Sequence, residues 1–197
     1  MGRGLARNDM RERLAQIAAR LMAEDGIEDF ALAKRKAARQ AGIPDSRQLP
    51  DNDEIEAALR SYRALYQQDY PLRLSEMRHL ALDVMTGLAV FNPHLTGALL
   101  NGIAGNFADI HLQLFAESDK AVEFELLNRG IRYRTGTARL YAGEIPIEAA
   151  VLSFEQDDVT VHLTLLSPRQ MRGHLKSSPG GRVIDRANQQ AVAALLG

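Results

Sequence analysis

The chain has 197 residues, a formal net charge of −1 and 46% hydrophobic residues. This length suits one domain or a small domain with a helical extension, and the apolar content is sufficient for a packed core. The charge excludes a globally basic nucleic-acid binder, although a local basic surface remains compatible with it. The absence of cysteine excludes disulfides, zinc–thiolate sites and cysteine nucleophiles.

The beginning of the chain is charged throughout, which is not the pattern of a signal peptide. No run of residues approaches the ~20 apolar residues that a membrane-spanning helix requires. We therefore expect a cytoplasmic protein without membrane association.

Helical spacing of apolar residues predicts helices over the first part of the chain, to about residue 91. The first helix is expected to begin near Asp9 and to end at Gly26. A shorter second helix is expected from Phe30 to near Gly42. The polar segment 45–52 is then the clearest linker in the chain.

A third helix is expected to start near residues 51–53 and to end before Pro71. A fourth helix follows and is broken at Asn92-Pro93, with Leu72 among its expected buried residues. We expect two domains, a helical N-terminal region over residues 1–70 and an α+β domain over residues 71–197.

The pattern after residue 93 changes to strands. Their expected ranges are His94–Leu99, Asp109–Phe115, Ile131–Leu140, Ile145–Phe154 and Val159–Leu166. A hairpin turn is expected at 155–158, and helices are expected from Ser118 through Leu127 and from about Asp185 to Leu196. This order predicts an α+β fold with a mixed or mostly antiparallel sheet.

The most informative stretch contains a glycine-punctuated turn followed by a strand that opens on an acid. Gly97-Ala98 ends the first strand, residues 100–108 form the turn, and Asp109 opens the second strand. Asp109 and His111 stand two residues apart, so they project from the same face of a strand.

Over roughly residues 75–166 this layout resembles the nucleotidyltransferase fold of the DNA polymerase beta superfamily. In that family a glycine and a small residue precede an Asp-x-Asp strand that holds magnesium, and a third acid comes from a neighbouring strand. The resemblance implies a nucleotidyltransferase-like mixed sheet with helices, preceded by an all-helical N-terminal extension. It also implies that Gly97, Ala98 and Asn101 meet the phosphates of a ligand.

The resemblance further implies that Asp109, His111 and His162 are the catalytic and metal-binding positions. This sequence departs from the family pattern at three points. Ala98 lacks the hydroxyl that helps to hold a phosphate, His111 replaces the second acid, and the strand 159–166 offers His162 but no acid.

One acid and two histidines suit zinc, manganese or iron better than magnesium, which prefers oxygen ligands. The expected cofactor is a divalent ion, Mg²⁺ or Mn²⁺, with Zn²⁺ as an alternative. A pair of histidines that binds an anion without a metal is also compatible with the sequence, as is ordinary packing of His111 and His162 across neighbouring strands. Asp109 would then cap a turn, and Glu148 is the one remaining acid considered for the site.

The segment 168–182 is basic and rich in Pro, Gly and Ser. Long loops often act as binding loops, so Arg169, Arg172, Lys176 and Arg182 are candidates for contact with an anionic ligand. A solvated surface loop is the alternative.

The chain is therefore predicted to be a divergent nucleotidyltransferase-like protein that binds a nucleotide or another phosphorylated ligand, with metal-dependent nucleotidyl transfer. The alternative is a non-catalytic binding or protein-interaction module on the same fold, with a nucleic acid or a protein as partner. A chance motif in an unrelated α+β protein is a third interpretation. The number of carboxylates near Asp109 discriminates between transfer and binding.

Overall fold

The computed structural model describes residues 2–27, 29–43, 49–105 and 107–196. The chain forms two compact units, one made of Met1–Arg73 with Gly102–Phe107, the other of Leu74–Asn101 with Ala108–Gly197. Of the expected linker 45–52, residues 45–48 lie outside the described residues.

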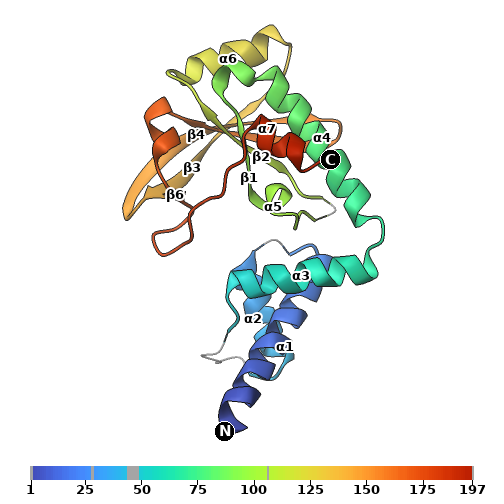
Figure 1. Cartoon of the computed structure of the whole chain (residues 1–197). Helices are drawn as coiled ribbons and strands as arrows, with labels where there is room; N and C mark the ends of the chain where they lie inside the picture. The colour runs from blue at the N-terminus through green and yellow to red at the C-terminus, as the bar shows by residue number, and fades with distance from the viewer. Residues whose placement is uncertain (1, 28, 44–48, 106, 197) are drawn as a thin grey trace. The chain divides into compact units, whose positions relative to one another are not determined.

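The first unit contains helices α1 (Gly2–Glu24), α2 (Phe30–Gln40) and α3 (Asn52–Tyr66) (Figure 1). Helix α1 packs against both α2 and α3. Asp9 lies inside α1 and does not cap it, because residues 2–8 continue the helix. The start of α3 is as expected: the Asp51 side chain accepts from the Glu54 backbone and the Glu54 side chain accepts from the Asp51 backbone.

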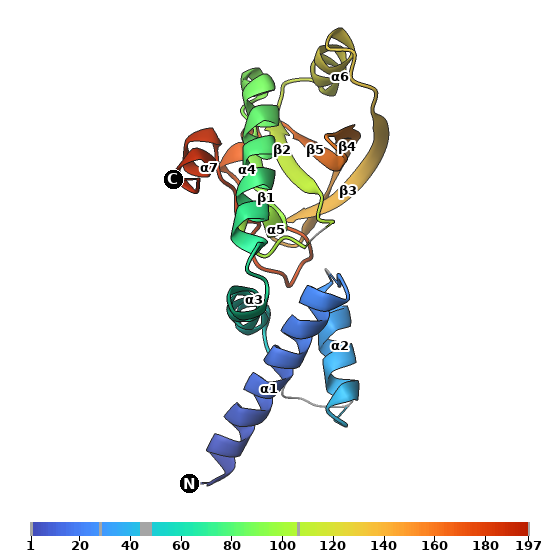
Figure 2. The same ribbon diagram turned by 90° about the vertical axis from the view of Figure 1, so that its right-hand side faces the viewer.

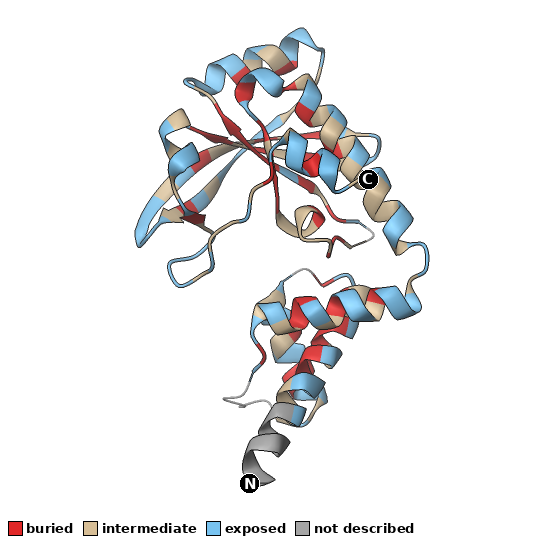
Figure 3. Ribbon diagram, viewed as in Figure 1, coloured by how far each residue is buried: buried red, intermediate tan, exposed pale blue. Residues whose placement is uncertain are grey.

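The buried residues of α1, α2 and α3 lie where these helices face one another (Figure 3), and they include small and branched apolar residues. Fully buried examples are Leu14, Ala18, Ala33, Ile55 and Leu59. Burial of this apolar surface is the main source of stability for the three helices, since most helical stability in proteins comes from packing of an apolar face.

The loop Gly102–Phe107 belongs to the first unit through a buried arginine of α3. Arg63 is 3% exposed, and its Nη1 donates to the Ala104 carbonyl at 2.6 Å and to the Tyr70 hydroxyl at 2.7 Å. The Tyr70 hydroxyl in turn donates to the Gly102 carbonyl. These bonds satisfy backbone oxygens that a buried loop would otherwise leave unpaired.

Helix α4 (Tyr70–Gly87) and the short helix η1 (Ala89–Phe91) lead to the first strand. The boundary between the two units falls inside α4, after Arg73. Leu72, expected to be buried, is 64% exposed, whereas Met85 is fully buried.

The second unit is built on a curled, mixed six-stranded sheet with the order β1-β2-β5-β4-β3-β6 (Figure 2). Among the strand pairs of the described residues, β2 with β5 is the one parallel pair. The expected α+β class and mixed sheet are confirmed. The strands are β1 (His94–Thr96), β2 (Ile110–Phe115), β3 (Arg134–Ala142), β4 (Ile145–Gln156), β5 (Val159–Leu166) and β6 (Leu175–Lys176).

The first strand is shorter than expected, because the chain turns at Gly97. Residues Gly97–Leu100 form the short helix α5, and Gly97 has φ = +74°. A left-handed conformation is accessible to glycine at little cost and ends the strand at Thr96.

The hairpin expected at 155–158 is confirmed, with Gln156 opposite Val159. Asp157 and Asp158 have φ of 50° and 62°, as a two-residue turn with right-handed strand twist requires. The basic segment after β5 contains η2 (Pro168–Arg172) and β6, and the last helix, α7 (Gln189–Ala194), is shorter than predicted. Helix α6 (Asp119–Asn128) begins after Ser118, as expected.

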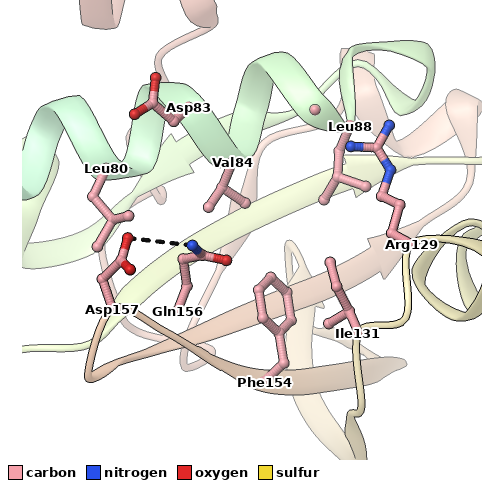
Figure 4. Close-up of a pocket in the computed structure, with 10 residues that line it drawn as sticks. Leu80, Asp83, Val84, Leu88, Arg129, Ile131, Phe154, Gln156 and Asp157 are labelled. Atoms are coloured by element: carbon pink, nitrogen blue, oxygen red, sulfur yellow. Dashed lines mark hydrogen bonds between the residues drawn. The ribbon is translucent and has the colours of Figure 1, made fainter.

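One face of the sheet is apolar and packs under α4. Figure 4 shows Leu80 and Val84 of α4 pointing down toward the end of β4 and its turn, where Phe154, Gln156 and Asp157 lie. A cavity of about 180 Å³ lies between α4 and the sheet and is also lined by Arg129, which pairs with Glu125 of α6. Within the described residues, none of the helices has both the length and the apolar content that crossing a bilayer demands.

Candidate metal centre

Two parallel strands bring the three sequence-predicted ligand residues together. In the β2–β5 pair, His111 lies directly opposite His162. Their rings stack with centroids 4.8 Å apart and an interplanar angle of 17°. Asp109 immediately precedes β2 and stands two positions before His111, so all three side chains lie on one face of the sheet.

That face of the sheet is turned away from α4, as the alternation of buried and more exposed residues along β2 and β5 shows. Ile110 and Leu112 of β2 and Val161 and Leu163 of β5 are fully buried on the opposite face. The intervening positions, His111 and His162 among them, therefore point to the other face, which farther along the strands carries a buried apolar cluster that includes Phe115 and Leu166. The apolar core holds the two strands in register and fixes the histidines beside each other.

Asp109, His111 and His162 form a cluster, and hydrogen bonds join two of its members, Asp109 and His162, to Ser153 in a chain of three side chains. His162 Nε2 lies 3.0 Å from Asp109 Oδ2, and His162 Nδ1 lies 2.8 Å from Ser153 Oγ. Ser153 belongs to β4 and faces His162 in the antiparallel β4–β5 pair. The candidate ligand atoms of Asp109, His111 and His162 all lie within 4.8 Å of one another.

The surroundings of His111 favour its neutral form. Although His111 is an exposed residue of β2, partial desolvation by neighbouring atoms lowers its pKa below the ordinary 6.5, and the nearby His162 lowers the pKa further. The Asp109 carboxylate acts in the opposite direction but does not compensate. A neutral imidazole is the form that binds a metal ion.

We expect this shift to appear as a pH-dependent stability of the metal-free protein. Between the lowered pKa of folded His111 and the ordinary value near 6.5, the unfolded chain binds more protons than the folded one. Stability should therefore fall as the pH falls through this window. Urea unfolding at pH 7.5 and 5.5 measures the loss, and His111→Gln should reduce it; a His111 midpoint at or above 6.5 by NMR would contradict the assignment.

The donor set fits a divalent cation with an affinity for nitrogen. Asp109 offers carboxylate oxygens, and the two histidines offer ring nitrogens from paired strands of the sheet. Imidazole and carboxylate together suit Zn²⁺, Mn²⁺ or Fe²⁺, and three protein ligands leave positions for water or a substrate. Asp109, His111 and His162 would hold such an ion.

The glycine turn lies beside this cluster at one point. A Cβ added to Gly97 would lie 3.9 Å from His111 Cδ2, and the Thr96 hydroxyl donates to the His111 carbonyl. Ala98 lies in α5, and Asn101 follows α5 as its C-terminal cap. Both are partly exposed.

The basic candidates lie farther along the sheet. Arg169 and Arg172 belong to η2, which follows the end of β5 and is exposed. His162 precedes that strand end by four residues, or about 13 Å at the usual rise of a strand. Lys176 pairs with Tyr141 at the opposite edge of the sheet, where β4 and β3 separate β6 from β5. Arg182 is exposed in the segment after β6.

The acid considered from the sequence, Glu148, is not part of the cluster. It is exposed, lies 3.8 Å from Arg139 of β3, and shares the strand face of Leu152 and Phe154. Among the described residues, the cluster therefore contains one carboxylate and two imidazoles.

Sequence reasoning missed two polar residues on the face of the cluster, Ser153 and Glu155. Glu155 is the cross-strand partner of Thr160 and accepts a hydrogen bond from its hydroxyl at 3.2 Å. The signal was available in the hairpin, because a two-residue turn at 157–158 places Ser153 opposite His162 by counting outward.

Comparison with known proteins adds no assignment to this geometry. The chain matches no protein-family model, no curated protein and no solved structure.

Proposed function

We propose that this chain binds a divalent cation through Asp109, His111 and His162 and, through that cation, a nucleotide or another phosphorylated ligand. The observation that carries the proposal is the convergence of three donor atoms within 4.8 Å, from two parallel strands with His111 opposite His162. The order of the elements along the chain also supports the proposal. A glycine turn, a strand that opens on an acid and a later partner strand follow one another as the resemblance to nucleotidyltransferases implies.

Nucleotidyl transfer is the activity that this resemblance favours. The reaction needs clustered metal ligands and positioning more than covalent chemistry by the protein. A bound cation would neutralise charge on the phosphates, and Gly97, Ala98 and Asn101 would lie on the ligand side of the turn. The basic residues Arg169, Arg172 and Lys176 remain proposed contacts for an extended anionic ligand.

A specific observation favours a second candidate, a binding module without transfer activity. Among the described residues the cluster has a single carboxylate, since Glu148 lies on the other face of its strand and Glu155, on the face of the cluster, bonds to Thr160 instead. Two-metal transfer depends on several carboxylates that share the ions. Such a module would recognise the phosphorylated ligand, a nucleic acid or a protein partner on the same sheet face.

Thermal unfolding with Mg²⁺, Mn²⁺ or Zn²⁺, alone and with each nucleoside triphosphate, tests the proposal. A ligand at 100 times its Kd stabilises by about 2.7 kcal/mol, so we expect Tm to rise by several degrees. Asp109→Asn should abolish the rise. Asp158→Asn, a matched change at the exposed β4–β5 turn, should preserve it.

The outcomes separate the two candidates. No shift with any ion or ion–nucleotide pair would refute the cation site and with it the proposed function. Ion-dependent nucleotide binding with transfer of labelled nucleotide to protein or RNA would support the transferase. The same binding without transfer would support the binding module.

A further inference from the structure

We propose that Ser153 is a positioning residue that sets the orientation and the tautomer of His162 for a nitrogen-preferring divalent cation. The inference rests on the proposed function, because it concerns the same site. It begins from two contacts on one ring, 2.8 Å from Nδ1 to Ser153 Oγ and 3.0 Å from Nε2 to Asp109 Oδ2.

The metal-free arrangement requires a particular placement of hydrogens on a neutral His162. An ionised Asp109 carboxylate can only accept a hydrogen bond, so Nε2 must carry the hydrogen. The other ring nitrogen, Nδ1, is then an acceptor, and the Ser153 hydroxyl must donate to it. Both polar contacts of His162 are satisfied in this tautomer.

Metal binding requires the opposite tautomer. When Nε2 gives its lone pair to a cation shared with Asp109, the ring hydrogen resides on Nδ1 and needs an acceptor. Ser153 Oγ can accept it after the hydroxyl rotates about its C–O bond. The hydrogen leaves Nε2 and an equivalent one is taken up at Nδ1 through solvent, so His162 keeps one ring proton throughout.

A hydroxyl is suited to both states, which is what singles out Ser153. A backbone carbonyl or a carboxylate at this position only accepts and would oppose the metal-free tautomer, whereas an ammonium only donates and would oppose the metal-bound one. A metal-bound imidazole commonly has such a hydrogen-bond partner on its second nitrogen. Ser153 would supply that partner from a neighbouring strand.

The fold holds the hydroxyl in place without help from a loop. Ser153 and His162 are direct cross-strand partners, and the register of their hairpin is set by the turn at Asp157 and Asp158. Leu152 and Phe154, on either side of Ser153, are buried in the core. The serine side chain therefore cannot shift along the strand without breaking this packing.

Cobalt(II) and zinc titrations of the full chain test the proposal, since the absorption bands of bound Co²⁺ report the ligand geometry. We expect Ser153→Ala to weaken Co²⁺ affinity by about 10- to 100-fold and to alter the spectrum. This is the usual effect of removing the hydrogen-bond partner of a metal-binding histidine. Ser153→Thr retains the hydroxyl and should recover most of the affinity. Ser177→Ala, at an exposed serine, should behave as the wild type.

Nitrogen-15 NMR of the wild type provides a second readout that does not depend on any variant folding. The His162 ring hydrogen should be on Nε2 in chelator-treated protein and on Nδ1 with Zn²⁺. A wild type that binds neither Co²⁺ nor Zn²⁺ would overturn the cation site of the proposed function. A wild type that binds them with Ser153→Ala equally tight and spectrally unchanged, or with no tautomer change at His162, would overturn the role of Ser153 alone.

Discussion

Replacing His162 with alanine is expected to weaken Zn²⁺ or Mn²⁺ affinity by more than the roughly 100-fold upper range for loss of a hydrogen-bond partner at a metal site. His162 would contribute a ligand nitrogen directly, and it also occupies the space between Asp109 and Ser153. Its removal leaves a two-residue set that lacks one donor and the ring that orients Asp109.

Isothermal titration with each ion measures the effect, with circular dichroism to show that the variant is folded. His174→Ala is the matched control, because His174 is exposed in the segment between η2 and β6. It should bind the ions as the wild type does. A metal affinity of His162→Ala within about threefold of the wild type would exclude His162 as a ligand. Loss of a direct ligand should reduce the affinity more than loss of a residue that only hydrogen-bonds to a ligand.

Replacing Leu163 with alanine is expected to reduce the free energy of unfolding by about 2–5 kcal/mol. Leu163 is fully buried in β5, the strand between β2 and β4, and faces Leu112 across the parallel pair. Truncation removes transfer free energy and leaves a cavity that the paired strands cannot close. The same strand carries His162, so the register of the cluster depends on this packing.

Urea unfolding followed by circular dichroism measures this loss. Leu127→Ala is the matched control, because Leu127 is 58% exposed on α6. Its effect should stay within about 0.5 kcal/mol, as is usual for surface substitutions. A loss below about 1 kcal/mol for Leu163→Ala, under the range for buried leucines, would contradict the central position of Leu163 in the core.

Local sequence patterns predicted the hairpin beside the cluster well. The strand predicted over Val159–Leu166 has the same bounds in the structure, and Asp157 and Asp158 form its turn. Alternation correctly placed Thr160, His162 and Thr164 on the more exposed face. These features depend on neighbours within a few residues, which is why the sequence contains them.

Two of the predictions that failed are the end of the first strand and the place of Glu148. The first depended on one backbone conformation, and the second on which face of a strand a residue occupies. The strand predicted to reach Leu99 ends at Thr96, because the left-handed Gly97 starts α5. Glu148 was considered for the site as the remaining acid near the start of a predicted strand. Its even spacing from Leu152 and Phe154 places it on the face that packs under α4, away from Asp109.

By itself, the sequence determined that an acid and a histidine share a face at the start of one strand, and that a second histidine lies on the exposed face of a later strand. It did not determine that the two strands pair in parallel with His111 opposite His162. Parallel pairing joins segments about fifty residues apart with no turn to set the register. Burial of the leucines on the opposite face determines which face the histidines occupy. The pairing of β2 with β5 in the folded sheet then brings Asp109, His111 and His162 together, with Ser153 in hydrogen-bond contact with His162.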